Sequence, residues 1–489
     1  MDLGILDWLV LAVYFAAILG VGLLFGRGER STHDFFLGGR TQHWLIVGLS
    51  ILATELSAVT FVLVPADSFR TDWTYLQMYA GAILGRVLIA VLLLPAFYGR
   101  SVTTVYEYLG RRFGPWTRTT ASALFVVSRL IGSGIRLLAA SLAIAVVFDW
   151  PVTLVIIGTA CVAVAYTTFG GIKAIIWTDA LQALVFLGGG VAVVIFMLVS
   201  VPGGLTSSIE AAYDAGKFRV FTWSGNLNCE KLFWVLLISS TVQNMAAMGT
   251  DQDMTQRMLT CPDLRRGQRS LLFNTLIGLP TVCLFLVIGS LMFAYSQTVP
   301  GSFPAELGDR GDRLFPYFIA NVLPAGVGLR GLLVAGVFAA AMSSLDSALG
   351  ALSSTAVTDF YRPICGSRIS ERHALIAARC FTFFFGLLLV AIALGFSSYD
   401  ELLWEVFRWA GLVLGAMLGV FLLGVLTRRR GRDGFNVIAM LTSVVLLVAL
   451  KLYQEQTGLV YIAWPWWVVV GSAWTFLWGM CLSTSPRRT

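Results

Sequence analysis

Apolar residues run along this chain in long stretches that short polar segments separate. A helix needs roughly 20 predominantly apolar residues to cross the hydrocarbon core of a bilayer. Thirteen stretches meet this requirement, and we expect each to form one transmembrane helix. They span about 7–26, 43–66, 76–98, 119–148, 151–168, 174–201, 231–249, 270–296, 329–358, 374–396, 402–426, 435–453 and 463–482. The pattern predicts an all-α integral membrane protein.

The composition agrees with a membrane protein and excludes several other classes. Hydrophobic residues make up 57% of the 489 residues and charged residues only 12%, whereas about a quarter of a soluble domain is charged. The seven cysteines form no CxxC pair, and the three histidines are scattered near predicted loops. Neither a metal cluster nor a Cys–His nucleophile pair is therefore expected. No nucleotide-binding loop is present either, so the sequence indicates a protein that is not an enzyme.

The basic residues predict how the chain is oriented. If the N-terminus lies outside, the cytoplasmic loops and the C-terminus hold twenty-one lysines and arginines and the outer loops hold six. Cytoplasmic loops of membrane proteins carry such an excess. We therefore expect a multi-pass protein of the plasma membrane with its N-terminus outside and its C-terminus in the cytoplasm. The cytoplasmic set includes Arg257, and the net charge of +7 reflects orientation rather than nucleic-acid binding.

A few ionisable residues fall inside the predicted spans. Each costs about 3 kcal/mol at the centre of a helix unless it is solvated or paired, so each is a candidate functional group. Arg86, Arg379 and Arg408 lie near predicted span ends, where their side chains can reach the lipid headgroups or a neighbour. The complete set is Glu55, Arg86, Arg129, Arg136, Asp179, Asp346, Arg379 and Arg408.

The second stretch is interrupted by polar residues. Residues 51–66 read ILATELSAVTFVLVPA, with Thr54, Glu55, Ser57 and Thr60 crowded together and Pro65 following. A break in the helix here would free backbone carbonyls in the middle of the membrane, and hard cations bind such oxygens. The alternative is a polar patch that only hydrogen-bonds a neighbouring helix.

The ninth stretch carries many hydroxyls and one acid. Residues 338–354 read FAAAMSSLDSALGALSS. At 100° per residue, small side chains share one stripe, with Asp346 on its flank. The stripe consists of Ala340, Ser343, Ser344, Ser347, Ala351 and Ser354. A packing seam between helices explains the serines, but it does not explain Asp346, which needs a cation, a proton or an arginine partner.

A third polar cluster follows a glycine pair. Residues 168–183 read TFGGIKAIIWTDALQA, in which the two glycines mark a break between spans. Thr178, Asp179 and Gln182 then enter the next helix, where Asp179 and Gln182 share a face. A surface acid at the mouth of the span is the alternative.

Three motifs resemble those of the sodium/solute symporter family, in the same order and over essentially the whole chain. They are GGIKAIIWTDALQA, GTDQDMTQRML and AAAMSSLDSALGALSSTAVTDFY. The resemblance implies a LeuT-like fold within a single transporter domain, built from two inverted repeats of five helices. The repeats would span 43–201 and 231–426, with an extra helix and loop in 1–42 and two further helices in 435–482.

The resemblance also implies cation sites. A first sodium ion would bind the backbone carbonyls of Ala53, Leu56 and Ala340 and the hydroxyls of Ser343 and Ser344. A possible second sodium site consists of Asp179, Ser344, Asp346 and Ser347. Members that have this second site carry serine where this chain has Asp346. The extra carboxylate could strengthen the site, carry a proton in place of sodium, or pair with an arginine.

The solute pocket implied by the resemblance lies beside the break in the second stretch. Ser57 and Thr60 resemble a hydroxyl pair of sialic acid carriers and related carboxylate carriers. Arg129 or Arg136 could hold a carboxylate in bidentate fashion, or either could pair with Asp346, Glu55 or Glu401. The candidate pocket residues are Glu55, Ser57, Thr60, Gln77, Arg129, Arg136, Gln243 and Asn244.

Sodium-coupled symport of a small organic solute into the cell is the function that we expect. The favoured solute is a carboxylate-bearing anion such as a monocarboxylate or a sialic-acid-like molecule, followed by a sugar or an amino acid. Sodium is the co-transported ion, and we expect the lipid bilayer but no nucleic acid and no obligate protein partner. The alternatives are a proton-coupled carrier in which Asp346 or Asp179 titrates, a membrane solute sensor and a channel.

Overall fold

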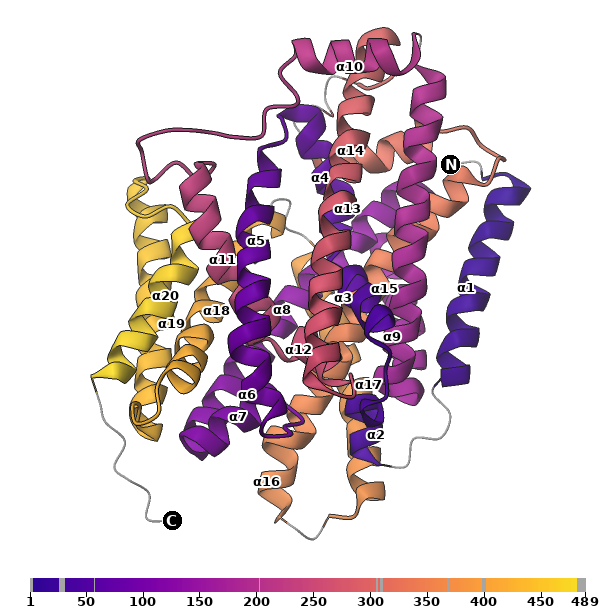
Figure 1. Ribbon diagram of the computed structural model, residues 1–489. Coiled ribbons are helices and arrows are strands. Elements are labelled where there is room, and N and C mark those ends of the chain that lie inside the picture. The colour runs from indigo at the N-terminus through magenta and orange to yellow at the C-terminus, as the bar shows by residue number, and fades with distance from the viewer. Residues whose placement is uncertain are drawn as a thin grey trace.

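The described part of the chain is almost entirely helical. The computed structural model describes residues 3–25, 31–56, 58–201, 203–304, 307, 311–366, 369–397 and 402–481. Figure 1 shows the helices as an upright bundle in which α1 begins near the upper end and α20 ends near the lower end. Short helices such as α10 lie across the top, and α2, α7 and α16 lie at the bottom.

The N-terminal half contains ten of the helices that the structure describes. The bounds are α1 Ile5–Phe25, α2 Thr32–Leu37, α3 Trp44–Glu55, α4 Ala58–Arg70, α5 Gln77–Leu88, α6 Leu94–Tyr98, α7 Val105–Arg112, α8 Pro115–Phe148, α9 Val152–Ser200 and α10 Gly204–Asp214. A π-helical turn, Ile89–Leu93, joins α5 to α6. The predicted spans 151–168 and 174–201 both fall in α9, which is interrupted at Gly171 with φ 51° and ψ −161°. The glycine pair therefore marks a break, as the sequence predicts.

The C-terminal half contains the remaining described helices. They are α11 Phe233–Gly249, α12 Gln252–Leu259, α13 Leu264–Thr298, α14 Gly311–Tyr317, α15 Leu329–Thr355, α16 Arg362–Cys365, α17 Glu371–Phe396, α18 Leu402–Leu426, α19 Asp433–Thr457 and α20 Pro465–Met480. Every predicted span overlaps a described helix. Within the described residues, eight helices are long and apolar enough to cross a membrane, or nine with the bent pair α3 and α4. The number thirteen and the repeat boundaries stay predictions.

The second predicted span is broken in the structure. The helix α3 ends at Glu55 and α4 starts at Ala58, and the two axes differ in direction by 59°. Leu56 leaves the helical region with ψ 71°, while its N–H still donates to the carbonyl of Leu52. Ser57 lies outside the described residues. Backbone carbonyls at the end of α3 therefore lack partners within the helix, as at any helix C-terminus.

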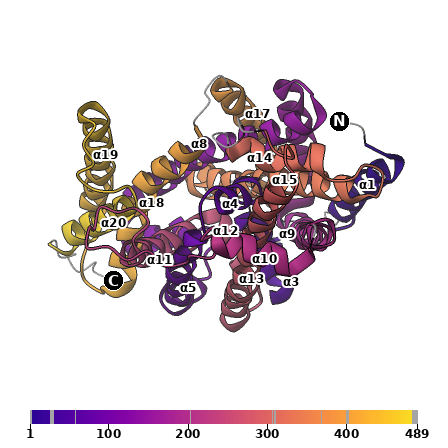
Figure 2. The ribbon, with the colours of Figure 1, turned by 90° about the horizontal axis from the view of Figure 1, so that it is seen from above.

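The helix α15 occupies the centre of the bundle. In Figures 1 and 2 it lies among α1, α3, α8 and α9, and almost all of its side chains are buried. The buried carboxylate of Asp7 on α1 accepts hydrogen bonds from the N–H groups of Gly326 (2.7 Å) and Gly331 (3.1 Å). A Cβ atom at Gly331 would lie 2.3 Å from the carbonyl oxygen of Asp7, so only glycine allows this approach. These hydrogen bonds and the close backbone contact hold α1 against the start of α15.

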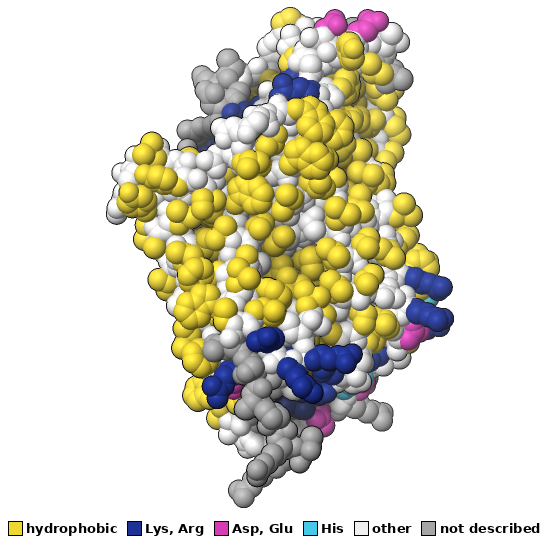
Figure 3. Space-filling view, turned by 60° about the vertical axis from the view of Figure 1, so that its left-hand side comes forward, with side chains coloured by type: hydrophobic (Ala, Val, Ile, Leu, Met, Phe, Trp, Pro, Cys, Tyr) yellow, Lys and Arg dark blue, Asp and Glu magenta, His cyan; other side chains and the backbone are white. Residues whose placement is uncertain are grey.

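The surface separates into an apolar band and a basic lower rim. Figure 3 shows hydrophobic side chains over most of the visible height, with most of the visible lysines and arginines below them and a smaller group near the top. Exposed leucine, isoleucine and valine side chains are numerous on α1, α9 and α19, and α17 exposes phenylalanines as well. A multi-pass membrane protein has such a band, because lipid replaces water around it.

Candidate functional site

Residues of the predicted first cation site meet where α15 passes the break between α3 and α4. The Ser343 hydroxyl lies 3.2 Å from the carbonyl oxygen of Ala53 and 3.4 Å from that of Ala340. Leu56, the next predicted ligand, is buried at the end of α3. The hydroxyl of Ser344 is buried and has no hydrogen-bond partner among the described residues. The end of α3 thus offers carbonyl oxygens to a hydroxyl of α15, and the next residue of α15 carries an unpaired hydroxyl; such oxygens suit a hard cation.

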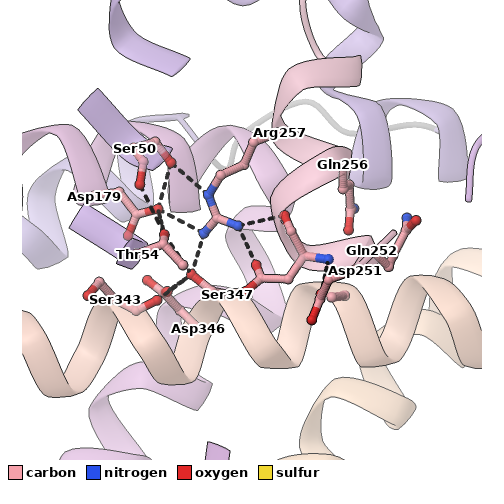
Figure 4. A network of polar contacts seen from close by, with 12 residues as sticks. Ser50, Thr54, Asp179, Asp251, Gln252, Gln256, Arg257, Ser343, Asp346 and Ser347 are labelled. Carbon is pink, nitrogen blue, oxygen red and sulfur yellow. Dashed lines mark hydrogen bonds and ion pairs between the residues drawn. The ribbon is translucent and has the colours of Figure 1, made fainter. Parts of the chain in front are cut away.

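Asp179 lies at the centre of a second polar network, which Figure 4 shows. Its Oδ2 accepts hydrogen bonds from Ser50 (2.7 Å) and from Thr54 (3.5 Å), both on α3. The hydroxyls of Thr54 and Ser347 are 3.3 Å apart, which connects α3 to α15. Asp179 is fully buried, so the alternative of a surface acid is wrong. Two residues of the predicted second cation site, Asp179 and Ser347, thus belong to one network.

Arg257 does not lie in a cytoplasmic loop, so the prediction from the basic residues is wrong at this position. It lies on α12 with a side chain only 1% exposed. Its Nη2 donates to Asp179 Oδ2 at 2.9 Å and also to the Ser347 hydroxyl. The one signal in the sequence is the i, i+4 pairing of Asp253 with Arg257, which form an ion pair. That spacing does not reveal that the segment after α11 turns back into the interior.

Asp346 is buried and has only hydroxyl partners among the described residues. Its Oδ2 accepts a hydrogen bond from Tyr166 on α9, and its Oδ1 accepts one of 3.2 Å from Ser347. Arg257 contacts the neighbouring Ser347 and not Asp346 itself. An arginine partner for Asp346 is therefore absent from the described residues, while the cation and the proton stay open.

Glu55 is paired rather than free to bind a solute alone. It forms an ion pair with Arg86 on α5, and it also accepts a hydrogen bond of 3.1 Å from Asn274 on α13. Arg86 is completely buried and donates to the Tyr79 hydroxyl at 3.2 Å. The prediction that Arg86 reaches the headgroups or a neighbour is resolved in favour of the neighbour. The Glu55 side chain keeps 28% exposure beside the helix break.

The other candidates for the solute pocket differ in how many hydrogen bonds their polar groups already form within the protein. The Gln77 amide bonds the carbonyls of Thr74 and Lys231 and the N–H of Thr222, so it holds the outer loop together. The Asn244 amide donates to the carbonyl of Ser240 on its own helix at 3.0 Å. Thr60 and Gln243 are half-buried.

The two arginines of α8 have different surroundings. Arg129 forms ion pairs with Asp251 and Asp253, so the expected partners Asp346 and Glu55 do not hold it. The third expected partner, Glu401, lies outside the described residues, and so does the Arg408 side chain. Arg136 follows Arg129 by about two helical turns and is half-buried. No ion pair or hydrogen bond joins it to another described side chain, so Arg136 is the one available to a ligand.

A broken helix in the membrane, beside a helix that carries hydroxyls and acids, is typical of one class of membrane protein. Secondary transporters bind coupling ions and solutes at such breaks. The chain belongs to the sodium:solute symporter family, whose model matches residues 35–450.

Relatives of known function span most of the chain. It is 32% identical over 461 residues to the sodium/sialic acid symporter SiaT of Proteus mirabilis (strain HI4320), covering 92% of this chain and 90% of that protein. It is 29% identical to the sodium-coupled monocarboxylate transporter 1 of Homo sapiens, covering 86% of this chain and 69% of that protein.

Solved structures agree in fold. The structure of a Na⁺-coupled sialic acid symporter, substrate-bound and outward-open, matches with a TM-score of 0.87 and 28% identity over 98% of both chains. Mhp1, a nucleobase-cation-symport-1 family transporter in a closed conformation, matches with a TM-score of 0.57 at 14% identity, which shows the fold alone. The predicted all-α, LeuT-like membrane fold is therefore confirmed.

Proposed function

We propose that this protein is a secondary active transporter that carries a small carboxylate-bearing organic anion into the cell together with sodium. The observation that supports it most is the Ser343 hydroxyl, which lies between the carbonyls of Ala53 and Ala340 at the helix break. The symporters of sialic acid and of monocarboxylates named above are its relatives, and both transport organic acids with sodium.

Sodium would bind where α3 ends against α15. The proposed ligands are the carbonyls of Ala53, Leu56 and Ala340 and the hydroxyls of Ser343 and Ser344. The unpartnered Ser344 hydroxyl supports this assignment, because buried polar groups in native proteins normally have a partner. An ion at this position would join the end of α3 to α15 more firmly than the hydrogen bonds of Ser343 with Ala53 and of Thr54 with Ser347 do alone.

Ion binding would favour the outward-open arrangement, to which the solute then binds. Rocking of one helical bundle against the other exposes both to the cytoplasm. Each sodium ion that enters supplies about 2.3 kcal/mol per 100 mV of membrane potential, in addition to its concentration gradient. This mechanism places the protein in the plasma membrane with its N-terminus outside, which the excess of basic residues at the lower rim supports.

The solute carboxylate would bind Arg136. Its guanidinium has no partner among the described residues, and a guanidinium can form two parallel hydrogen bonds with a carboxylate. Arg129 forms ion pairs with Asp251 and Asp253, so we propose that it stabilises the fold and does not bind the solute. Thr60 and Gln243 are proposed to bind the remaining polar groups of the solute, and Ser57, Glu55 and Asn244 are further candidates.

Uptake into proteoliposomes that contain the full-length protein tests this function. The probes are radiolabelled acetate, lactate, N-acetylneuraminic acid, glucose and alanine, each offered in sodium or in choline at the same pH. We expect uptake of at least one of the three acids, and only in sodium. Uptake that is the same in choline would refute sodium coupling, and uptake of glucose or alanine alone would refute the choice of an anion.

Proton coupling through Asp346 is a second candidate, because that buried carboxylate has no arginine partner in the described residues. Acid-driven uptake in choline would identify it.

A further inference from the structure

Arg379 is a charged residue inside a predicted span, and the structure gives it no partner among the described residues. It lies on α17, eight residues after Glu371, where that helix begins. Its side chain is half-buried, and its Nε is buried without a hydrogen-bond partner. A charge within a span is costly unless it is solvated or paired, so the Arg379 guanidinium needs a partner from outside the described protein.

Arg372 lies on the same side of α17 and also has no partner among the described residues. Two helical turns, about 10 Å along the axis, separate it from Arg379. Helical side chains point back toward the N-terminus, so the Arg379 guanidinium extends toward the level of Arg372. The helix starts shortly after α16, which lies at the lower end of the bundle in Figure 1, so both arginines can reach the lipid headgroups there.

The acid at the start of α17 is already paired elsewhere. Glu371 forms an ion pair of 2.6 Å with Arg362, and it accepts hydrogen bonds from the N–H (3.0 Å) and the hydroxyl (2.8 Å) of Thr32. Adjacent residues on a helix do not face each other, so Glu371 is badly placed to neutralise Arg372. Two positive charges therefore remain on this side of the helix start.

An apolar groove of about 420 Å³ runs along α17 beside these arginines, and its walls include Ile376, Cys380 and Phe384. All three side chains are exposed, and Figure 2 shows α17 at the edge of the bundle, so the groove faces lipid. They recur at every fourth residue and follow the helix for about 12 Å. Ile376 and Arg379 are about 60° apart around the helix axis, so the arginines flank the groove.

The groove is polar only near the start of α17. There the Tyr361 hydroxyl and His373 Nε2 are 2.7 Å apart, and the two rings lie nearly parallel. Further along the helix the walls are apolar. The order of guanidinium groups, polar side chains and apolar walls matches that of a phosphate, its glycerol ester and an acyl chain in a phospholipid.

We propose that this side of α17 is a binding site for an anionic phospholipid. The phosphate binds Arg372 and Arg379, and one acyl chain occupies the groove. In the orientation proposed above, the lipid belongs to the cytoplasmic leaflet. The site contains no residue of the helix break or of the solute pocket, so the inference does not depend on sodium symport.

A general attraction between the basic lower rim and an anionic membrane surface predicts something different. Such an attraction depends on the number of positive charges near the surface and not on a groove. Removing any two arginines of the rim would then weaken lipid binding equally, and filling the groove would have no effect. A matched pair of arginines elsewhere on the rim therefore separates the two explanations.

The test is the melting temperature of the purified full-length protein in detergent, in choline, as phosphatidylglycerol is added. Phosphatidylcholine with the same acyl chains and inorganic phosphate are the comparison probes. The key variant combines Arg372→Gln with Arg379→Gln. Its control combines Arg428→Gln with Arg429→Gln, two exposed arginines that follow α18. Cys380→Trp fills the groove and keeps both arginines of α17.

We expect phosphatidylglycerol to raise the melting temperature of the wild type at concentrations where the other two probes do not. The concentration that gives half of this increase should be about tenfold higher or more in the key variant, because charge-assisted hydrogen bonds are lost. It should also be higher in Cys380→Trp and unchanged in the control pair.

Three results would overturn the inference. They are an equal response of the wild type and the key variant, an equal loss in the control pair, and a response to phosphatidylcholine or inorganic phosphate that equals the response to phosphatidylglycerol. If the key variant does not fold, Cys380→Trp decides the matter, and a wild-type response in it would refute the site. Each of these results leaves sodium-dependent uptake untouched, so failure of the lipid site is distinguishable from failure of the proposed function.

Discussion

The two polar regions along α15 hold their oxygens in different states. Around Ser343, at the break between α3 and α4, the hydrogen bonds are long and the Ser344 hydroxyl has no described partner. Around Ser347, one turn further along, a buried arginine donates hydrogen bonds to side-chain oxygens of three helices. The first region is suited to an ion that arrives and leaves, and the second is held together by a buried ion pair. Helix position alone therefore does not decide which hydroxyls bind an ion.

The largest effect is expected from removing the internal cation without compensation. Arg257→Met leaves the carboxylates of Asp179 and Asp253 without their shared partner in the interior. We expect the free energy of unfolding to fall by about 3–5 kcal/mol, and thermal unfolding in detergent measures the change. A melting temperature equal to that of the wild type would show that the network does not hold α12 in place.

Arg136→Gln compared with Arg129→Gln sharpens the contrast on α8. A charge-assisted hydrogen bond contributes about 1.5–3 kcal/mol, so we expect carboxylate affinity to fall roughly tenfold or more in Arg136→Gln with little change in thermal stability. Arg129→Gln should show the reverse, because it breaks ion pairs with Asp251 and Asp253. Competition binding and thermal unfolding of both variants check this. Equal carboxylate affinity in Arg136→Gln and the wild type would contradict the assignment.

Asp346→Asn asks whether the extra carboxylate of this chain binds a proton. The amide keeps a hydrogen-bonding group beside Tyr166 and Ser347 but cannot ionise. If Asp346 is protonated during transport, we expect uptake to continue with a flatter dependence on external pH than in the wild type. Uptake at several pH values in constant sodium measures this. Unchanged pH dependence would exclude a proton at Asp346.

The sequence predicted the helices and the elements of the first region well, because local patterns carry both. Long apolar runs mark spans, and the polar run at Thr54 and Glu55 and the Gly170–Gly171 pair mark the breaks that the structure has, whereas Pro65 lies inside α4. The stripe of small residues on α15 also predicted the close packing of that helix. These features depend on neighbouring residues alone.

The second region was only partly predictable, because its contacts join residues far apart in sequence. Arg257 is 78 positions from Asp179 and 207 from Ser50. Within its own segment, only the i, i+4 spacing from Asp253 separates it from the basic residues of a cytoplasmic loop. The same limit applies to Arg86, whose partner Glu55 lies 31 positions earlier. Buried ion pairs between helices become visible only when the packing of the helices is known.

The half-maximal sodium concentration for uptake in Ser343→Ala tests the central claim most directly. Ser353→Ala is the matched control, because this serine is buried on the same helix and its hydroxyl bonds only the carbonyl of Gly350 among the described residues. One hydroxyl ligand contributes about 1 kcal/mol to the free energy of sodium binding, so its loss in Ser343→Ala should raise the half-maximal sodium concentration roughly fivefold. Ser353→Ala should have the half-maximal sodium concentration of the wild type. An unchanged sodium requirement in Ser343→Ala, with normal folding, would contradict a sodium site at the break of α3 and α4.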